Sequence, residues 1–114
     1  MPKFLFVYRD PLPDPKAAPP GPEVIQQILA AWGAWIDKFA KTGNITDPGD
    51  ALKPTGRVVR TTGVTDGPFV EAKEVLGGYS VITADSYEAA VDIAKECPAV
   101  QHGPVEIREM AGYS

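Results

Sequence analysis

The segment from Phe4 to Tyr8 carries apolar side chains in every position, and its aromatic and β-branched residues favour a β-strand. Side chains alternate along a strand, so Phe4, Phe6 and Tyr8 share one face. Leu5 and Val7 then point to the opposite face. A sheet covered by helices on one side normally alternates apolar with polar residues. The second face of this strand needs a cover of its own, and we expect a homodimer packed sheet against sheet.

The chain is short and acidic. Its 114 residues are enough for one core, so we expect a single domain over residues 1–114. The formal net charge is −4, and an acidic chain without clustered Lys and Arg argues against nucleic acid as a partner. The single cysteine, Cys97, cannot form an internal disulfide. The apolar run at residues 4–8 is too short for a signal peptide or a membrane span, which predicts a cytoplasmic protein without a membrane partner.

A long amphipathic helix is predicted from Pro22 to Lys41. Proline suits the first helical position, and a lysine in the last turn with Gly43 beyond it is typical of a helix end. The apolar stripe consists of Val24, Ile25, Ile28, Leu29, Trp32, Trp35, Ile36 and Phe39. Trp32 and Trp35 lie on this stripe and are expected to be core anchors, with the lining of a ligand pocket as the alternative.

Three further strands are predicted from runs rich in β-branched residues. They are Arg57–Val64, Tyr79–Ala84 and Val105–Met110. Asp66-Gly67 is a hairpin signal and predicts a turn, followed by a short return strand over residues 68–71. Two segments dense in proline and other turn formers, residues 11–22 and 46–56, are expected to be loops.

A second helix is predicted between the last two strands. Asp85 followed by Glu88 has the spacing of a capping box, and Pro98 would end the helix. The order strand, helix, strand with hairpin, strand, helix, strand is the split βαβ pattern of a ferredoxin-like α+β fold. Two helices would then cover one face of an antiparallel sheet. Cys97 lies on the apolar side of this helix and is expected to be a small buried hydrophobe.

The stretch from Thr65 to Tyr79 has the most specific residue choices in the chain. It combines Asp66-Gly67-Pro68-Phe69 with Glu71, Lys73-Glu74 and Gly77-Gly78-Tyr79. This combination resembles the signature of the DGPF family within the YCII-related superfamily. The resemblance implies a dimeric α+β barrel of ferredoxin-like protomers. It also implies two kinds of function, since some YCII-like relatives are thought to be enzymes with a His and Asp pair, and some DGPF proteins are encoded beside sigma factors.

Asp66 is the first candidate for a catalytic residue. It matches the family motif and is predicted to act as a general base or as a hydrogen-bond acceptor for a small polar substrate, with apolar Phe69 favouring its protonated form. The alternative is an aspartate that only caps its own turn. His102 is a second, weaker candidate, because histidine can change charge near neutral pH. It precedes the last strand, whereas the family's histidine is expected in the first half of the chain, so no His–Asp pair carries over.

Four residues near this stretch are candidates for substrate binding. They are Arg60, Glu71, Lys73 and Tyr79. Lys73 would hold an anionic group at the rim of a cleft, and a solvated ion-pair cluster with Glu71 and Glu74 is the alternative. Gly77-Gly78 lacks the helix start of a phosphate-binding loop and predicts close packing at a strand entrance. One histidine and one cysteine predict no metal site, and no cofactor is expected.

Three functions are compatible with these residues. The one we favour is a small-molecule site in a dimeric protein, which binds a ligand or runs acid–base chemistry centred on Asp66. The second is a noncatalytic interaction or regulatory module, including one linked to sigma-factor regulation. The third, a cofactor-free monooxygenase-like enzyme, follows only from fold analogy. A closed pocket around Asp66 would favour the first, and an Asp66 bonded only within its own turn would favour the second.

Overall fold

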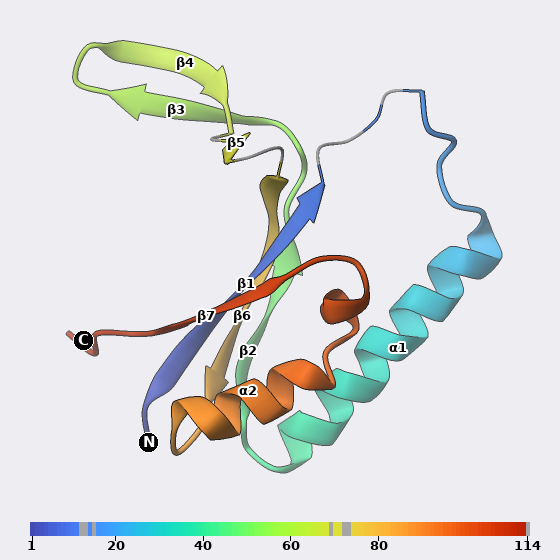
Figure 1. Cartoon of the computed structure of the whole chain (residues 1–114), viewed down its shortest axis with the longest axis vertical. Helices are drawn as coiled ribbons and strands as arrows, with labels where there is room; N and C mark the ends of the chain where they lie inside the picture. The colour runs from blue at the N-terminus through green and yellow to red at the C-terminus, as the bar shows by residue number, and fades with distance from the viewer. Residues whose placement is uncertain (12–13, 15, 69, 72–73, 114) are drawn as a thin grey trace.

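Figure 1 shows the computed structural model, which describes residues 1–11, 14, 16–68, 70–71 and 74–113. The main sheet is antiparallel, with strand order β2-β6-β1-β7, and the short β5 pairs with β6. The strands of this sheet are β1 (Lys3–Pro11), β2 (Ile45–Ala51), β5 (Val70–Glu71), β6 (Glu74–Thr83) and β7 (Val105–Glu109). Together with α1 (Pro22–Lys41) and α2 (Tyr87–Lys95), this order confirms the predicted ferredoxin-like α+β fold.

Both helices pack on the face of the sheet that carries Phe4, Phe6 and Tyr8. The core cluster joins these side chains to buried residues of the two helices, which are Trp35, Phe39, Ala90, Ile93 and Ala94. The indole Nε1 of Trp35 donates a hydrogen bond of 3.0 Å to the carbonyl oxygen of Ile93 and so ties α1 to α2. This buried donor is satisfied, which a tryptophan in a core requires.

The opposite face of the sheet is also apolar. Leu5 of β1 pairs with Val81 of β6, and Val7 lies on the same face two residues along the strand. Leu5 and Val81 are half-buried in the single chain. The prediction that β1 is apolar on both faces is therefore confirmed. The two helices cover only the face that carries Phe4, Phe6 and Tyr8.

The helix ends follow local capping chemistry. Gly43 follows α1 with φ +81°, as predicted for a left-handed cap. The predicted capping of α2 by Asp85 is wrong, because Ser86 is the extended residue before the helix and its Oγ accepts a 3.1 Å hydrogen bond from the Ala89 amide. The helix ends before Pro98, which opens a short 3₁₀ turn, η1 (Pro98–Gln101).

The second strand of the main sheet comes from a segment predicted to be a loop. β2 contains Asp47-Pro48-Gly49-Asp50 and pairs with β6 through two register shifts. Pro48 lies in the irregular part, where no regular ladder bond is needed, and an edge strand tolerates it. Tertiary pairing with β6 has overridden a sequence full of turn formers, so the loop prediction for residues 46–56 is wrong for β2.

The segment predicted to be this strand forms a separate hairpin instead. β3 (Gly56–Arg60) pairs with β4 (Gly63–Gly67), and the chain reverses at residues 61–62. The predicted turn at Asp66-Gly67 is therefore wrong, because Asp66 lies inside β4, opposite Arg57. Figure 1 shows this hairpin projecting away from the main sheet and both helices. None of the described helices is long and apolar enough to cross a membrane.

Candidate functional site

A β-bulge with two adjacent glycines interrupts the pairing of β1 with β6. Tyr8 pairs with Gly78 and Arg9 pairs with Leu76, so Gly77 is the extra residue. A Cβ on Gly77 would lie 1.8 Å from the Asp10 Oδ2, and a Cβ on Gly78 would lie 2.9 Å from the carbonyl oxygen of Asp50. The close packing predicted for these glycines is confirmed, although they lie within β6 and not at its entrance.

The bulge leaves a strip of the helix-facing sheet surface without side chains, and a cavity of about 630 Å³ lies above it. We call it the glycine-floored cavity. It lies between the sheet and α1 and also borders η1 and the residue that follows it. The residues that line it are Tyr8, Asp10, Ile28, Leu29, Trp32, Ile36, Pro48, Gly49, Asp50, Ala51, Gly77, Gly78, Tyr79, Ala99 and His102.

The apolar walls are formed mainly by the first half of α1. Ile28 and Trp32 are half-buried and Leu29 is exposed, whereas Trp35 and Phe39 of the second half are buried in the core. The helix thus fills the core with its second half, while its first half keeps apolar surface open. Figure 1 shows the first half of α1 leading away from the body of the sheet.

Tyr8 forms one end of a buried hydrogen-bonded chain beside the cavity. Its hydroxyl donates to Ser80 Oγ over 2.7 Å, and Ser80 Oγ donates to the carbonyl oxygen of Pro48, also over 2.7 Å. Its ring meets that of Trp32 edge to face, with 5.2 Å between centroids. Burial raises the pKa of Tyr8 far above its ordinary value, and burial also raises the pKa of the Cys97 thiol. Tyr8 is therefore a neutral donor at physiological pH and not a base.

Charged side chains reach the cavity at Asp10 and Asp50. The Asp10 carboxylate lies over the Gly77 Cα, on the same face of β1 as Tyr8. Asp50 Oδ1 accepts a hydrogen bond of 2.8 Å from the Ala51 amide. None of the described residues that line the cavity is a lysine or an arginine, and His102 is the histidine among them.

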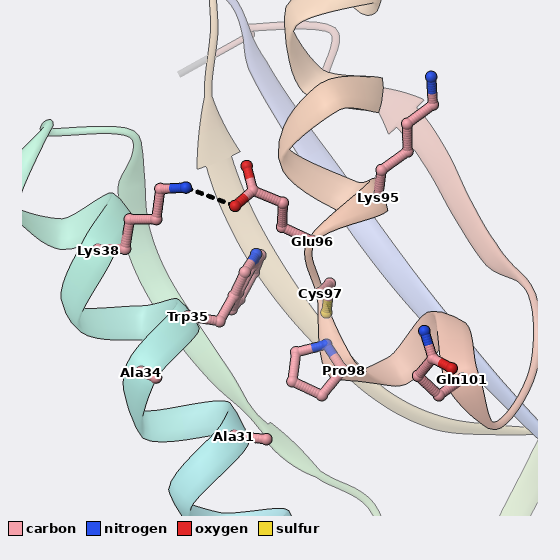
Figure 2. Close-up of a pocket in the computed structure, with 9 residues that line it drawn as sticks. All are labelled: Ala31, Ala34, Trp35, Lys38, Lys95, Glu96, Cys97, Pro98 and Gln101. Atoms are coloured by element: carbon pink, nitrogen blue, oxygen red, sulfur yellow. Dashed lines mark hydrogen bonds and ion pairs between the residues drawn. The ribbon is translucent and has the colours of Figure 1, made fainter.

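A second cavity of about 380 Å³ lies on the other side of α1. We call it the interhelix cavity. Figure 2 shows Trp35 reaching from α1 toward Cys97 and Pro98, with Lys38 ion-paired to Glu96 beside it. Cys97 is buried, as predicted. This cavity is smaller than the glycine-floored cavity, and two of its charged groups, Lys38 and Glu96, are paired with each other.

The structure separates the residues predicted to form one site. Asp66 lies on the β3–β4 hairpin with its side chain 92% exposed, and its Oδ1 is 3.5 Å from the Arg57 Nε. Arg60, on the same hairpin, donates from Nη1 to Thr65 Oγ1 over 3.4 Å. In contrast, Tyr79 and His102 both border the glycine-floored cavity, although Tyr79 pairs with Val7 and so has its side chain on the sheet face opposite the helices.

Three residues of the predicted site, Phe69, Glu71 and Lys73, have no described side-chain environment. Lys73 and Phe69 lie outside the residues that the structure describes, and Glu71 is described only as a backbone position in β5. The predicted effect of Phe69 on Asp66 therefore has no described contact behind it. What the structure does describe for Asp66 is an exposed carboxylate beside an arginine.

Asp10 is the functional candidate that sequence reasoning missed. A signal for it was present, because Asp10 continues the series Phe4, Phe6, Tyr8 on one face of the first strand. Core packing does not explain why an aspartate should stand at the end of this apolar face. Among the described residues, His, Cys, Asp and Glu do not gather in any group of three that could hold a metal ion.

Fold and cavity together define a small ferredoxin-like α+β protein with a ligand-sized hollow between its sheet and its first helix. The sequence matches the YCII-related domain over residues 12–112, which is most of the chain. The protein therefore belongs to the YCII-related family. A search of curated proteins finds no significant match.

Proposed function

We propose that this YCII-related protein binds a small, largely apolar molecule in the glycine-floored cavity. The observation that carries the proposal is the cavity itself, whose volume of about 630 Å³ is within the usual range for ligand pockets, about 300–1,000 Å³. Aliphatic and aromatic walls with a few polar groups are the typical lining of such pockets. The glycines explain why the hollow exists, because a Cβ on Gly77 would meet the Asp10 carboxylate and a Cβ on Gly78 would meet the β2 backbone.

The polar groups of the cavity would orient the ligand. Asp10 and His102 can accept or donate protons, and they come from β1 and the turn after η1, at the border of the cavity. If the bound molecule undergoes acid–base chemistry, these two residues are better placed for it than Asp66. The role predicted for Asp66 stays a separate hypothesis, and replacing it with asparagine tests it.

Thermal-shift screening with small aromatic and alicyclic compounds tests the proposal, because a bound ligand raises the unfolding temperature. The Ile28→Trp variant should fill part of the cavity and reduce the shift. Val59→Trp places the same side chain on the exposed hairpin and should leave the shift unchanged. If no compound shifts the wild type, or if both variants respond alike while remaining folded, the cavity is not the binding site.

We also propose that the protein is a homodimer of the DGPF type. Support comes from the half-buried Leu5 and Val81 beside Val7, on the sheet face opposite the helices, and from the Asp66-Gly67-Pro68 motif. A second copy would cover this apolar face. Sedimentation of the wild type as two chains, with Leu5→Asp as a monomer, is the expected result, and a monomeric wild type would exclude the dimer.

The β3–β4 hairpin favours a second candidate function, that of an interaction module. Val59 and Val64 form a cross-strand pair and remain 75% and 62% exposed. Contiguous apolar surface that is exposed on a protein marks sites of contact with other proteins, and this pair would form the centre of such a site. Under this alternative, Val59→Asp would abolish partner binding while the glycine-floored cavity stays empty of any physiological ligand.

A further inference from the structure

The charges around the glycine-floored cavity indicate which class of ligand it would hold. We infer that the ligand carries an amine or another cationic group, which pairs with Asp10 while its apolar part lies against Trp32 and Tyr8. This inference depends on the proposed function, because it assigns a charge to the molecule bound in the same cavity. It predicts a preference for cationic over neutral and anionic ligands, which a purely apolar pocket would not have.

The first argument is the balance of charge in the lining. Asp10 and Asp50 are carboxylates, and the described lining includes neither lysine nor arginine. Asp50 already accepts a hydrogen bond from the Ala51 amide, whereas the Asp10 carboxylate is positioned over the side-chain-free bulge at Gly77. An anionic ligand would meet like charge at Asp10 and Asp50, and the described lining offers it neither lysine nor arginine. A cationic ligand would form a charge-assisted hydrogen bond there.

The second argument is the place of the aromatic rings. Tyr8 is two residues from Asp10 on the same face of β1, and its ring contacts the Trp32 ring at 5.2 Å between centroids. Both rings line the cavity. Aromatic faces attract ammonium groups as well as apolar surface. A molecule with an aromatic or alicyclic body and an amine two or three bonds away would therefore satisfy the carboxylate and the rings at once.

The third argument concerns Tyr8, which is the other polar side chain that β1 contributes to the cavity. Its hydroxyl donates to Ser80, which donates in turn to the Pro48 carbonyl. Because this donor is already used, Tyr8 does not attract an anion to the cavity. Of the two polar side chains that β1 contributes to the cavity, Asp10 is thus the one that decides the charge of the ligand.

Three compounds with the same phenyl group and different charges test the inference. These are 2-phenylethylamine, 2-phenylethanol and 3-phenylpropionate, titrated into the full-length protein and followed by calorimetry or amide chemical shifts. We expect the amine to bind about tenfold more tightly than the alcohol, which corresponds to one charge-assisted hydrogen bond, and the carboxylate to bind most weakly.

Two variants with the same change of net charge locate the effect. Asp10→Asn should reduce the preference for the amine to less than about twofold. Asp37→Asn, on α1 and outside the cavity lining, should keep the tenfold preference. Equal binding of amine and alcohol, or a preference that survives Asp10→Asn, would overturn the inference and leave the cavity as a binding site. Failure of all three compounds to bind would instead count against the proposed function.

Discussion

The β3–β4 hairpin and the glycine-floored cavity each take residues from one end of the stretch 65–79, and the environments of these two ends are opposite. On the hairpin, Asp66 is exposed and lies across from Arg57 in a two-stranded sheet. At the cavity, Gly77 and Gly78 are pressed against Asp10 and the β2 backbone. The comparison shows that Asp66 faces solvent, whereas Gly77 and Gly78 shape the cavity.

The largest expected effect is at the β2 edge of the cavity. Gly49 has φ +74°, and a Cβ there would lie 1.7 Å from the Tyr79 carbonyl oxygen. Gly49→Ala should lower the free energy of unfolding by about 3 kcal/mol, because the strained backbone and the clash with β6 add together. Urea denaturation measures the change.

Two controls show whether this cost belongs to the cavity. Gly33 lies in α1 with open space around its Cβ position, so Gly33→Ala should raise stability by about 0.5–1 kcal/mol. Thr62→Ala at the tip of the hairpin should change stability by less than about 0.5 kcal/mol. If Gly49→Ala were as mild as Thr62→Ala, the tight approach of β2 to β6 would be disproved.

The second effect is a loss of stability at alkaline pH. Burial raises the pKa values of Tyr8 and Cys97, so both groups stay protonated in the folded state when the unfolded chain has begun to ionise. Their contribution is complete below the unfolded values, about 8.5 for Cys and about 10 for Tyr, and is lost as pH rises above them. The free energy of unfolding should fall by up to about 1.4 kcal/mol per pH unit for each group.

The Cys97→Ala variant separates the two groups. Its alkaline loss should begin near pH 10, where Tyr8 alone remains, while the wild type begins to lose stability near pH 8.5. Denaturant titrations at a series of pH values measure both onsets. A wild type whose stability is constant up to pH 11 would contradict the burial of these side chains beside the cavity.

A smaller effect is expected from the hydroxyl of Tyr8. Tyr8→Phe removes the donor to Ser80 and should cost about 1 kcal/mol, since Ser80 keeps its bond to Pro48. Tyr113 is fully exposed near the chain end, so Tyr113→Phe should have no measurable effect. Similar costs for the two substitutions would mean that the buried hydrogen-bonded chain is not formed.

The smallest effect should come from the residue that the sequence favoured most. Asp66→Asn is expected to change the free energy of unfolding by less than about 0.5 kcal/mol, because an exposed ion pair with Arg57 contributes little. Binding of a ligand to the glycine-floored cavity should also be unchanged. A large loss of binding in a folded Asp66→Asn variant would restore Asp66 as a site residue.

The ferredoxin-like order could be predicted from sequence because its signals are local. The apolar stripe of α1, Pro22 at its start and Gly43 at its end are all visible in the chain. β2 could not be predicted, since Asp47-Pro48-Gly49-Asp50 has the composition of a loop and becomes a strand only by pairing with β6. Local propensity yields to tertiary pairing at such edges.

The candidate site was predicted less well for a related reason. Tyr79 and His102 were named from sequence and do line the cavity, but nothing local indicated that Asp10 would lie over Gly77, 67 positions later in the chain. The attention given to Asp66 followed from a motif whose residues are adjacent in sequence. The two ends of this motif pair with different strands, because Asp66 pairs with β3 and Gly78 pairs with β1 and β2.

Mapping amide chemical shifts by NMR while 2-phenylethylamine is added tests the central claim most directly. The account predicts the largest changes at residues 77–79, 28–36 and 99–102, around the glycine-floored cavity, with residues 56–67 of the hairpin unaffected. Chemical-shift changes concentrated on the hairpin, with none at Gly77 and Gly78, would contradict the account.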